Sequence, residues 1–397
     1  MGCSSSPTQR ITMSMPLLHT QLKTQLSQWI SPQDKRHLDG FAENVAAILQ
    51  SQSGCLSRWL TYLSHRSCQA RSHLERLGYF VHNPKITSAT FYAPLVRQFL
   101  KAWVGKSVTL TLDTSVLWDQ YCLIEVCFVW GGRSIPLAQQ VLEHGSATVG
   151  YDNYRTVLET TLTVLPSPCQ VTLLADRGFE HGALIRWLQD HDWSWAIRAK
   201  SDLNVTLGTG ETTSIATLLP PSDEAYLFRK VTVLGDIQCH LAMANVSMAG
   251  EPWAVITDTS PSLQTFALYG QRFGGIEPHF KDYKSAAFEV TESRLRDVQA
   301  LTCLLMLLAA ATLIAIVLAV IVVTQGRRAT LDWHAQRGLS FLQLGLRELE
   351  RLGYLGLPLL KLSPLPRWQP PPACASRKKQ DYLDTRIEFS KVTVFSA

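Results

Sequence analysis

The stretch SVTLTLDTSVLWDQYCLIEVCFVWGGRSIPLA, residues 107–138, decides the fold because its apolar residues follow the period of a β-strand. Apolar and polar residues alternate over 108–112, and 121–130 is a second, almost wholly apolar run. A glycine pair then precedes a third short apolar run at 134–138, as a tight turn requires. The pattern predicts three antiparallel strands, and it places Asp113 at the end of the first.

Helical and apolar segments alternate after these strands. The expected elements are a helix over 154–164, a strand over 171–175, a helix over 179–191 and a strand over 193–198. The order β-β-β-α-β-α-β predicts an α/β fold with a mixed five-stranded sheet flanked by helices. Further apolar runs at 226–234, 237–244 and 253–258 predict a β-rich insertion at about 201–260.

Two basic regions flank this predicted core, which we place at 105–330. Residues 1–104 have helical periodicity over 17–30, 40–50, 57–77 and 92–103, and residues 331–397 read as a helical segment with a Pro-rich basic tail. Arg58, Arg66, Arg71 and Arg76 fall along one predicted helix, as a ridge facing phosphates or as an ordinary solvated face.

Composition excludes a mainly disordered chain, since 46% of the 397 residues are hydrophobic and 17% are charged. Nine cysteines without a CxxC pair indicate a reducing compartment, with neither a disulfide framework nor a zinc ribbon. The net charge is +6 over 1–100 (10 minus 4), −7 over 101–325 (15 minus 22) and +6 over 326–397 (12 minus 6). This charge distribution is typical of a protein whose basic ends bind a polyanion and whose acidic centre holds a cluster of carboxylates. Ordinary solvated faces would also produce it.

Two segments resemble membrane signals. Residues 1–6, MGCSSS, match the short pattern for N-myristoylation, although Met13 and Met15 are equally good starts. Residues 301–324 are apolar enough to span a bilayer, and a helix buried within a large domain is the alternative.

Two aspartates follow apolar strands, Asp113 in LTLDTS and Asp176 in LLADRGF. If the two strands are neighbours, both carboxylates emerge at one edge of the sheet, where they need protons or cations. Oxygen ligands of this kind suit Mg²⁺, whereas a lone aspartate after a strand is ordinarily a turn or a helix cap.

A third acid lies in YGQRFGGIEPHFKDYKS, residues 269–285. With the two aspartate stretches, this block resembles bacterial insertion-sequence transposases of the DDE type, whose last acid sits in a Tyr-x2-Arg-x3-Glu-x6-Lys signature. The resemblance covers roughly 105–325 and implies a ribonuclease-H-like core. It also implies a metal-binding catalytic triad and neighbouring DNA contacts, namely Asp113, Asp176 and Glu277 for the triad and Tyr269, Arg272 and Lys284 for DNA.

One departure from the signature concerns the spacing of its residues. Four residues instead of three separate Arg272 from Glu277, which on an ideal helix widens the arc of the signature from about 60° to about 140°. A bulge or a late helix start at Gly274-Gly275 would restore a common face. The alternative is a degenerate copy in which Arg272 no longer reaches the site. Glu289 and Glu292 lie beyond the matching lysine and are rejected as third acids.

The resemblance also changes how 301–324 is interpreted, because family members continue from the glutamate helix into an apolar helix packed on the sheet. We therefore expect a buried helix. The implied activity is strand cleavage and transfer at terminal inverted repeats by a homodimer in the bacterial cytoplasm, near the nucleoid. It would use two Mg²⁺ ions, replaceable by Mn²⁺, and no small-molecule substrate. The alternatives are a non-catalytic protein anchored in a membrane by 301–324 and a DNA-binding relic without activity.

Overall fold

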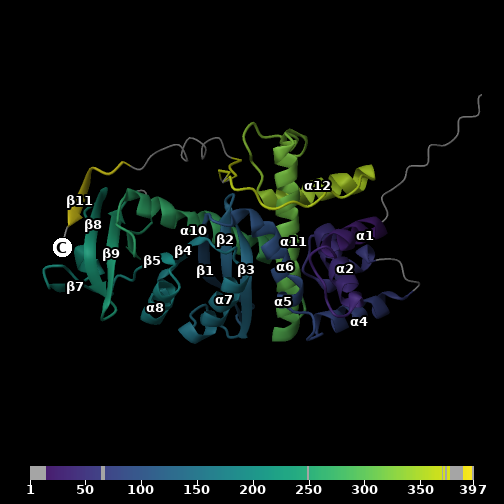
Figure 1. Ribbon diagram of the computed structural model, residues 1–397, viewed down its shortest axis with the longest axis horizontal. Helices are drawn as coiled ribbons and strands as arrows, with labels where there is room; N and C mark the ends of the chain where they lie inside the picture. Colours follow the sequence, from purple (N-terminus) through teal and green to yellow (C-terminus); the bar gives the residue numbers. More distant parts are fainter. Residues whose placement is uncertain are drawn as a thin grey trace, which may run out of the picture.

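The computed structural model describes residues 15–63, 68–247, 250–368, 370–371, 373–375 and 388–395, and describes the side chains from residue 18 onward. Figure 1 shows a sheet in one half of the molecule and a group of helices in the other, with one long helix between them. The N-terminal MGCSSS motif, Arg66 and the basic run Arg377-Lys378-Lys379 lie outside the described residues.

The sheet is mixed, and the described part has 11 strands in one continuous array. The order is β3-β2-β1-β4-β5-β10-β9-β8-β6-β7, and β11 pairs with β8. The strands are β1 Ser107–Leu117, β2 Tyr121–Trp130, β3 Arg133–Glu143, β4 Gln170–Ala175, β5 Ser194–Arg198, β6 Asn204–Thr206, β7 Thr212–Ser214, β8 Glu224–Val233, β9 Ile237–Asn245, β10 Trp253–Thr257 and β11 Lys391–Phe395.

The α/β class is confirmed, but the predicted five-stranded limit of the sheet is wrong. Strand β10 pairs antiparallel with β5, so the strands predicted as an insertion extend the same sheet. The C-terminal segment adds β11 in parallel to β8 over Glu224–Phe228. Apolar periodicity reveals single strands but not which strand edges meet, since pairing between distant segments has no local signal.

The helices cover the sheet and form the second half of the molecule. They are α1 Met15–Leu26, α2 Lys35–Ser51, α3 Leu56–Trp59, α4 Ala70–Val81, α5 Ser88–Phe91, α6 Ala93–Leu100, α7 Tyr151–Val164, α8 Gly182–Asp190, α9 Ile215–Leu218, α10 Leu263–Lys281, α11 Val298–Thr324 and α12 Phe341–Leu355. Helices α7 and α10 both contact β2 and β3. All residues of β2 are buried, so both of its faces are covered, which explains its continuous apolar sequence.

Two predicted helices have different bounds. The helix expected over 57–77 is divided, so Arg58 lies in α3 while Arg71 and Arg76 lie in α4, and they form no single ridge. The helix expected from Glu277 into the apolar run is interrupted, because α10 ends at Lys281 and a π-helical turn, Asp282–Ala286, follows. A new helix then begins at Val298, where the Asp297 side chain accepts a hydrogen bond from the Ala300 N–H.

The apolar segment forms the core helix between the two halves. Helix α11 passes the length and composition test for a membrane span, yet 89% of its most apolar window is buried within the molecule. It contacts β3 on one side, α2 and α4 on another, and α12 (Figure 1). The contact with α12 is close, since a Cβ on Gly345 would lie 1.8 Å from the Ala315 carbonyl oxygen. Surrounding protein thus accounts for an apolar surface on every side of the helix.

Candidate functional site

The two predicted aspartates lie side by side on neighbouring parallel strands. Leu112 of β1 pairs with Ala175 of β4 in parallel register, so the residues that follow them, Asp113 and Asp176, occupy adjacent positions. Asp176 follows β4 directly, as predicted. The prediction that Asp113 ends its strand is wrong, because β1 continues to Leu117 by pairing with β2.

Backbone groups orient both aspartates in the same way. The Thr114 N–H donates to Asp113 Oδ1 at 2.9 Å, and the Arg177 N–H donates to Asp176 Oδ1 at 2.8 Å. The second oxygens, Asp113 Oδ2 and Asp176 Oδ2, lie 2.8 Å and 3.9 Å from Nη2 of Arg272. One oxygen of each carboxylate is therefore fixed by the backbone, and the other faces a shared cation.

Helix α10 completes the cluster with Arg272 and Glu277. Arg272 Nη1 lies 3.9 Å from Glu277 Oε1, so the guanidinium contacts all three predicted acids. The Arg272 side chain is 5% exposed, whereas that of Glu277 is 57% exposed. The exposure of the three acids therefore increases across the site, from Asp113 in the interior to Glu277 at the surface.

The extra residue of the signature does not remove Arg272 from this site. Helix α10 is α-helical through Gly274 and Gly275, so the predicted bulge at these glycines is wrong. The long arginine side chain bridges the angular difference instead. Gly275 has another role, since a Cβ there would lie 2.9 Å from Ser134 Oγ, so the glycine lets α10 approach β3 closely.

Burial dominates the electrostatics of Asp113. It raises the pKa of this carboxyl to about 6, and the nearby Asp176 also raises it, although Arg272 and the Thr114 N–H lower it. Burial alone lowers the pKa of Arg272, but Asp113 and then Tyr269 and the other acids reverse this, and the net direction is upward. The site thus holds a carboxylate that folding makes hard to ionise.

The remaining residues of the signature occupy different environments. Tyr269 is fully buried against Trp253 and Phe273, and burial raises its pKa. Its hydroxyl has no hydrogen-bond partner among the described residues. Lys284 is partly exposed in the π-helical turn, and no ion pair joins it to the three acids in the described structure. The DNA contacts of Tyr269, Arg272 and Lys284 stay predictions.

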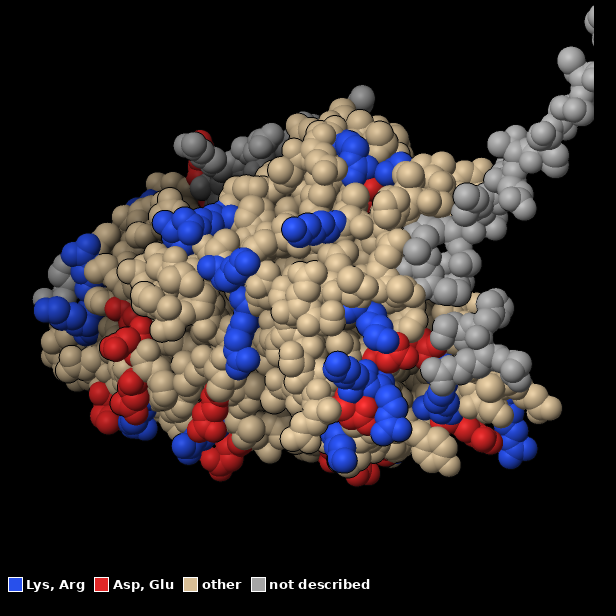
Figure 2. Space-filling view, turned by 45° about the vertical axis from the view of Figure 1, so that its right-hand side comes forward, with Lys and Arg blue, Asp and Glu red and all other residues tan. Residues whose placement is uncertain are grey.

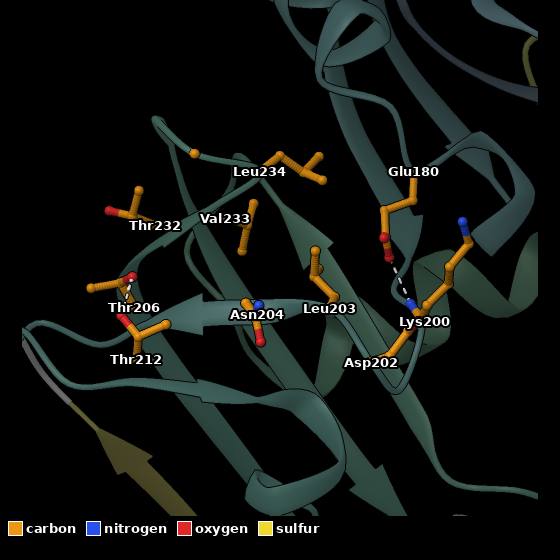
Figure 3. Close-up of a pocket in the computed structure, with 11 residues that line it drawn as sticks. Glu180, Lys200, Asp202, Leu203, Asn204, Thr206, Thr212, Thr232, Val233 and Leu234 are labelled. Carbon is orange, nitrogen blue, oxygen red and sulfur yellow. Dashed lines mark hydrogen bonds between the residues drawn. The ribbon is translucent and has the colours of Figure 1, made fainter.

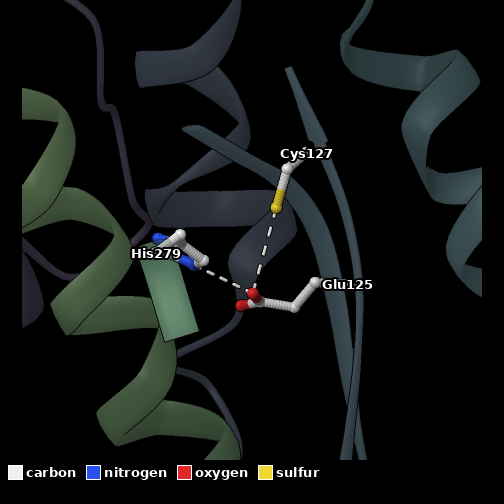
Figure 4. Close-up of side chains that lie close together, drawn as sticks. All are labelled: Glu125, Cys127 and His279. Carbon is white, nitrogen blue, oxygen red and sulfur yellow. Dashed lines mark hydrogen bonds and ion pairs between the residues drawn. The ribbon is translucent and has the colours of Figure 1, made fainter. Parts of the chain in front are cut away.

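A second polar cluster, which the sequence interpretation missed, lies beneath α10. Glu125 of β2 and His279 of α10 are fully buried, and His279 Nε2 lies 2.9 Å from Glu125 Oε2 (Figure 4). Cys127 Sγ lies 3.9 Å from the same oxygen, and burial raises the thiol pKa well above its usual range. Within the described chain, these three residues form the group whose ligand atoms lie close enough for one metal ion. The charge of Glu125 inside an apolar strand was the available signal.

This cluster connects the two elements that carry the acids. Glu125 pairs with Asp113 across β2 and β1, and His279 lies two residues after Glu277 on α10. A further buried contact joins Arg133 of β3 to Asp282 at 3.0 Å, just after the end of α10. Polar contacts from β2 and β3 therefore hold the helix to the sheet on the C-terminal side of Glu277.

An open hollow of about 500 Å³ lies away from these acids, in the outer part of the sheet. Its wall includes Glu180, Lys200 and Asn204, with threonines of β6, β7 and β8 (Figure 3). Glu180 accepts a hydrogen bond from the Lys200 backbone N–H at 2.6 Å, and burial raises the Glu180 pKa. None of the six predicted site residues lines this hollow.

Comparisons with known proteins give a family match. Residues 125–314 match the family described as the transposase DDE domain. No curated protein matches the chain. Among solved structures, a cryo-EM structure of a piggyBac transposase synaptic complex with hairpin DNA is similar at 11% identity and a TM-score of 0.45, over 88% of this chain and 82% of that chain. The family match confirms the resemblance to DDE transposases over the matched residues.

Proposed function

We propose that this chain is a metal-dependent DNA transposase that cleaves the ends of its own element and joins them to a target. The observation that carries the proposal is the convergence of Asp113, Asp176 and Glu277 on one guanidinium, from two strands and a helix. Two of these acids lie inside the region that matches the transposase DDE domain. Strands β3-β2-β1-β4-β5 have the mixed order that a ribonuclease-H-like core needs, and we propose that assignment for them.

The donor type fits a hard divalent cation, although the structure places the Arg272 guanidinium among the three acids, and the ligand atoms that it groups closely enough for one ion are those of Glu125, Cys127 and His279. All three acids offer carboxylate oxygens, and each aspartate keeps one oxygen clear of its backbone hydrogen bond. We assign Asp113, Asp176 and Glu277 as the residues that would hold two Mg²⁺ ions, or Mn²⁺ in their place. Bound there, the ions would activate the attacking oxygen and stabilise the leaving 3′-oxygen.

Two basic residues of this chain would balance the charge of the acids and position the DNA for this reaction. Arg272 supplies the positive charge that keeps three carboxylates together, and a guanidinium can also bind phosphate oxygens. Lys284 is partly exposed on the same segment, where it can contact the DNA backbone. In the reaction, water attacks phosphorus, the bond to the 3′-oxygen breaks and that oxygen takes a proton. The freed 3′-hydroxyl then attacks the target strand in the same way.

The proposed partners follow from this chemistry and from the charge of the chain. We propose that residues 1–104, with a net charge of +6 over 1–100, bind the terminal inverted repeats, and that two copies act together on DNA in the bacterial cytoplasm. The packing of α11 inside the molecule favours this function over a membrane anchor. The contact between Arg272 and Glu277 favours an active site over a degenerate one.

The test uses the full chain and plasmid DNA carrying the sequences that flank its gene. Wild type is expected to nick the element ends with Mg²⁺, whereas Asp113→Ala, Asp176→Ala and Glu277→Ala bind the ends but do not nick them. Glu292→Ala is the matched control, because this acid lies in the next helical turn outside the cluster and should leave nicking unchanged. Nicking by Asp176→Ala would refute the assignment of the triad. End binding without cleavage by wild type, in either metal, would identify an inactive relic.

A further inference from the structure

An exposed tryptophan stands on the loop between α11 and α12. Trp333 is 83% exposed and stacks on His334 with ring centroids 4.0 Å apart. An exposed tryptophan on an ordered loop offers a large flat face on which another ring can stack. The loop is defined here as the Trp333 loop, residues 326–340.

Buried charges hold the Trp333 loop in one shape. The side chain of Asp332 is fully buried and accepts hydrogen bonds from the backbone N–H groups of His334, Gly338 and Leu339. Arg328 pairs with Asp332 at 3.1 Å and donates to the carbonyl oxygens of residues 334, 335 and 336. The ring is therefore presented on a preorganised support, which lowers the entropy lost on binding.

The surface around the ring is basic. Residues 327–351 contain five arginines and three acids, a net charge of +2 (5 minus 3). Two of those acids, Asp332 and Glu348, have fully buried side chains and pair with Arg327, Arg351 and Arg328, so the excess positive charge comes from the other two arginines, Arg337 and Arg347. Arg347 is exposed and donates to the Leu331 carbonyl oxygen, two residues from the tryptophan. Near the top of Figure 2, where the end of α11 lies in Figure 1, more Lys and Arg atoms are visible than Asp and Glu atoms.

A continuous set of contacts joins this loop to the end of α10. Arg337 donates to the Gly131 carbonyl oxygen in the turn between β2 and β3. In the same turn, Arg133 pairs with Asp282, which lies two residues before Lys284. The β2–β3 turn therefore connects the segment that carries Lys284 to the Trp333 loop through these polar contacts.

We propose that the Trp333 loop binds DNA next to the cleavage site, with an unpaired base stacked on Trp333 and the neighbouring phosphates on arginines such as Arg347. This inference rests on the proposed function and names where the DNA beyond the cut is held. An aromatic platform with a basic border is the recurring solution for unpaired nucleotides. A strand end freed by cleavage supplies such nucleotides when it separates from its complement.

The test compares two fluorescently labelled probes, a blunt duplex with one terminal repeat and the same duplex with a single-stranded extension. Trp333→Ala is expected to weaken binding of the extended probe by about 5- to 150-fold and to change blunt-duplex binding by much less. Trp333→Phe should recover part of the loss. Tyr354→Ala is the matched control, because Tyr354 is 87% exposed on the neighbouring helix α12 and should leave both affinities unchanged. Arg347→Gln should reduce the salt dependence of binding, as loss of one phosphate contact requires.

Three outcomes would overturn the inference. Equal affinity of Trp333→Ala and wild type for the extended probe excludes stacking. An equal loss on both probes indicates a duplex contact instead. A change in self-association at unchanged DNA affinity assigns the ring to a second copy of the chain. Failure of the proposed function is separate, because it appears as absence of Mg²⁺-dependent nicking by wild type, which this binding assay does not use.

Discussion

Replacing Asp113 with asparagine should stabilise the protein while it abolishes cleavage. Folding raises the pKa of Asp113 from 3.8 to about 6, so the ionised form is less favourable in the folded chain than in the unfolded chain. The difference of about 2.2 pKa units corresponds to about 3 kcal/mol at pH 7, at 1.36 kcal/mol per unit. This value already includes the attraction of Arg272, which burial outweighs. Asparagine keeps the shape and removes the ionisation, but it replaces one of the two acceptor oxygens with an N–H donor, so about 3 kcal/mol is the upper limit of the gain.

The sign of the pH dependence follows from proton binding. Between pH 3.8 and 6 the folded chain binds more protons at this site than the unfolded chain, so its stability falls as pH rises through that window. The advantage of Asp113→Asn is therefore about 3 kcal/mol above pH 6, about half of that at pH 5, and nearly absent below pH 3.8.

Urea unfolding at pH 7 and pH 5, with divalent cations chelated, measures both values. Asp236→Asn is the matched control, since Asp236 is 71% exposed and pairs with Arg186 at the surface, where the change should be under about 1 kcal/mol. Added Mg²⁺ should stabilise wild type more than Asp113→Asn, because only wild type keeps the full set of carboxylates. A variant that is less stable than wild type at pH 7 would refute the reasoning, because Arg272 would then outweigh burial.

Three further predictions concern the framework around the site. Gly345→Ala should destabilise the chain by more than about 2 kcal/mol, because its Cβ would collide with the backbone of α11, whereas Gly353→Ala on the same helix meets nothing within 4 Å and should be neutral or stabilising in thermal unfolding. His279→Ala should cost about 1–3 kcal/mol by removing the buried 2.9 Å hydrogen bond to Glu125, and loss of less than about 0.5 kcal/mol in urea unfolding would show that the pair does not support α10. Burial raises the pKa of Asp332, but hydrogen bonds from His334 and the loop N–H groups outweigh burial and set the pKa at about 2. The contribution of Asp332, about 2 kcal/mol, is present above pH 3.8 and is lost as pH falls towards 2, so Asp332→Asn should lower the unfolding free energy at pH 6 but not at pH 2.

The sequence predicted the acids better than their surroundings. Asp113 and Asp176 follow apolar runs, and parallel pairing of such runs brings the residues after them together. The position of Glu277 came from the resemblance to a family signature. The contact among all three depends on how far the Arg272 side chain reaches across α10, which a helical wheel drawn for Cα atoms does not describe.

Sequence patterns gave less information about the extent of the sheet and about the buried polar pairs than about the acids. The pairing of β10 with β5 joins segments 55 or more residues apart, and no residue in either strand specifies that edge. Glu125 stood out as one charge in an apolar strand, but its partner His279 lies 154 residues away on α10. Sequence patterns identify a buried polar residue more readily than they identify what satisfies it.

The position of α11 explains why hydropathy alone favoured a membrane span. A helix facing solvent needs one polar side, but α11 contacts β3, α2, α4 and α12 around its circumference. The Gly345 contact shows how closely α12 closes one side, because even a methyl group would meet the α11 backbone. The contact with α12 holds α11 in place, and the Trp333 loop begins just after α11 ends at Thr324. The apolar core that resembles a membrane span therefore also determines where the proposed DNA-binding tryptophan stands relative to the β2–β3 turn and the acids of the site.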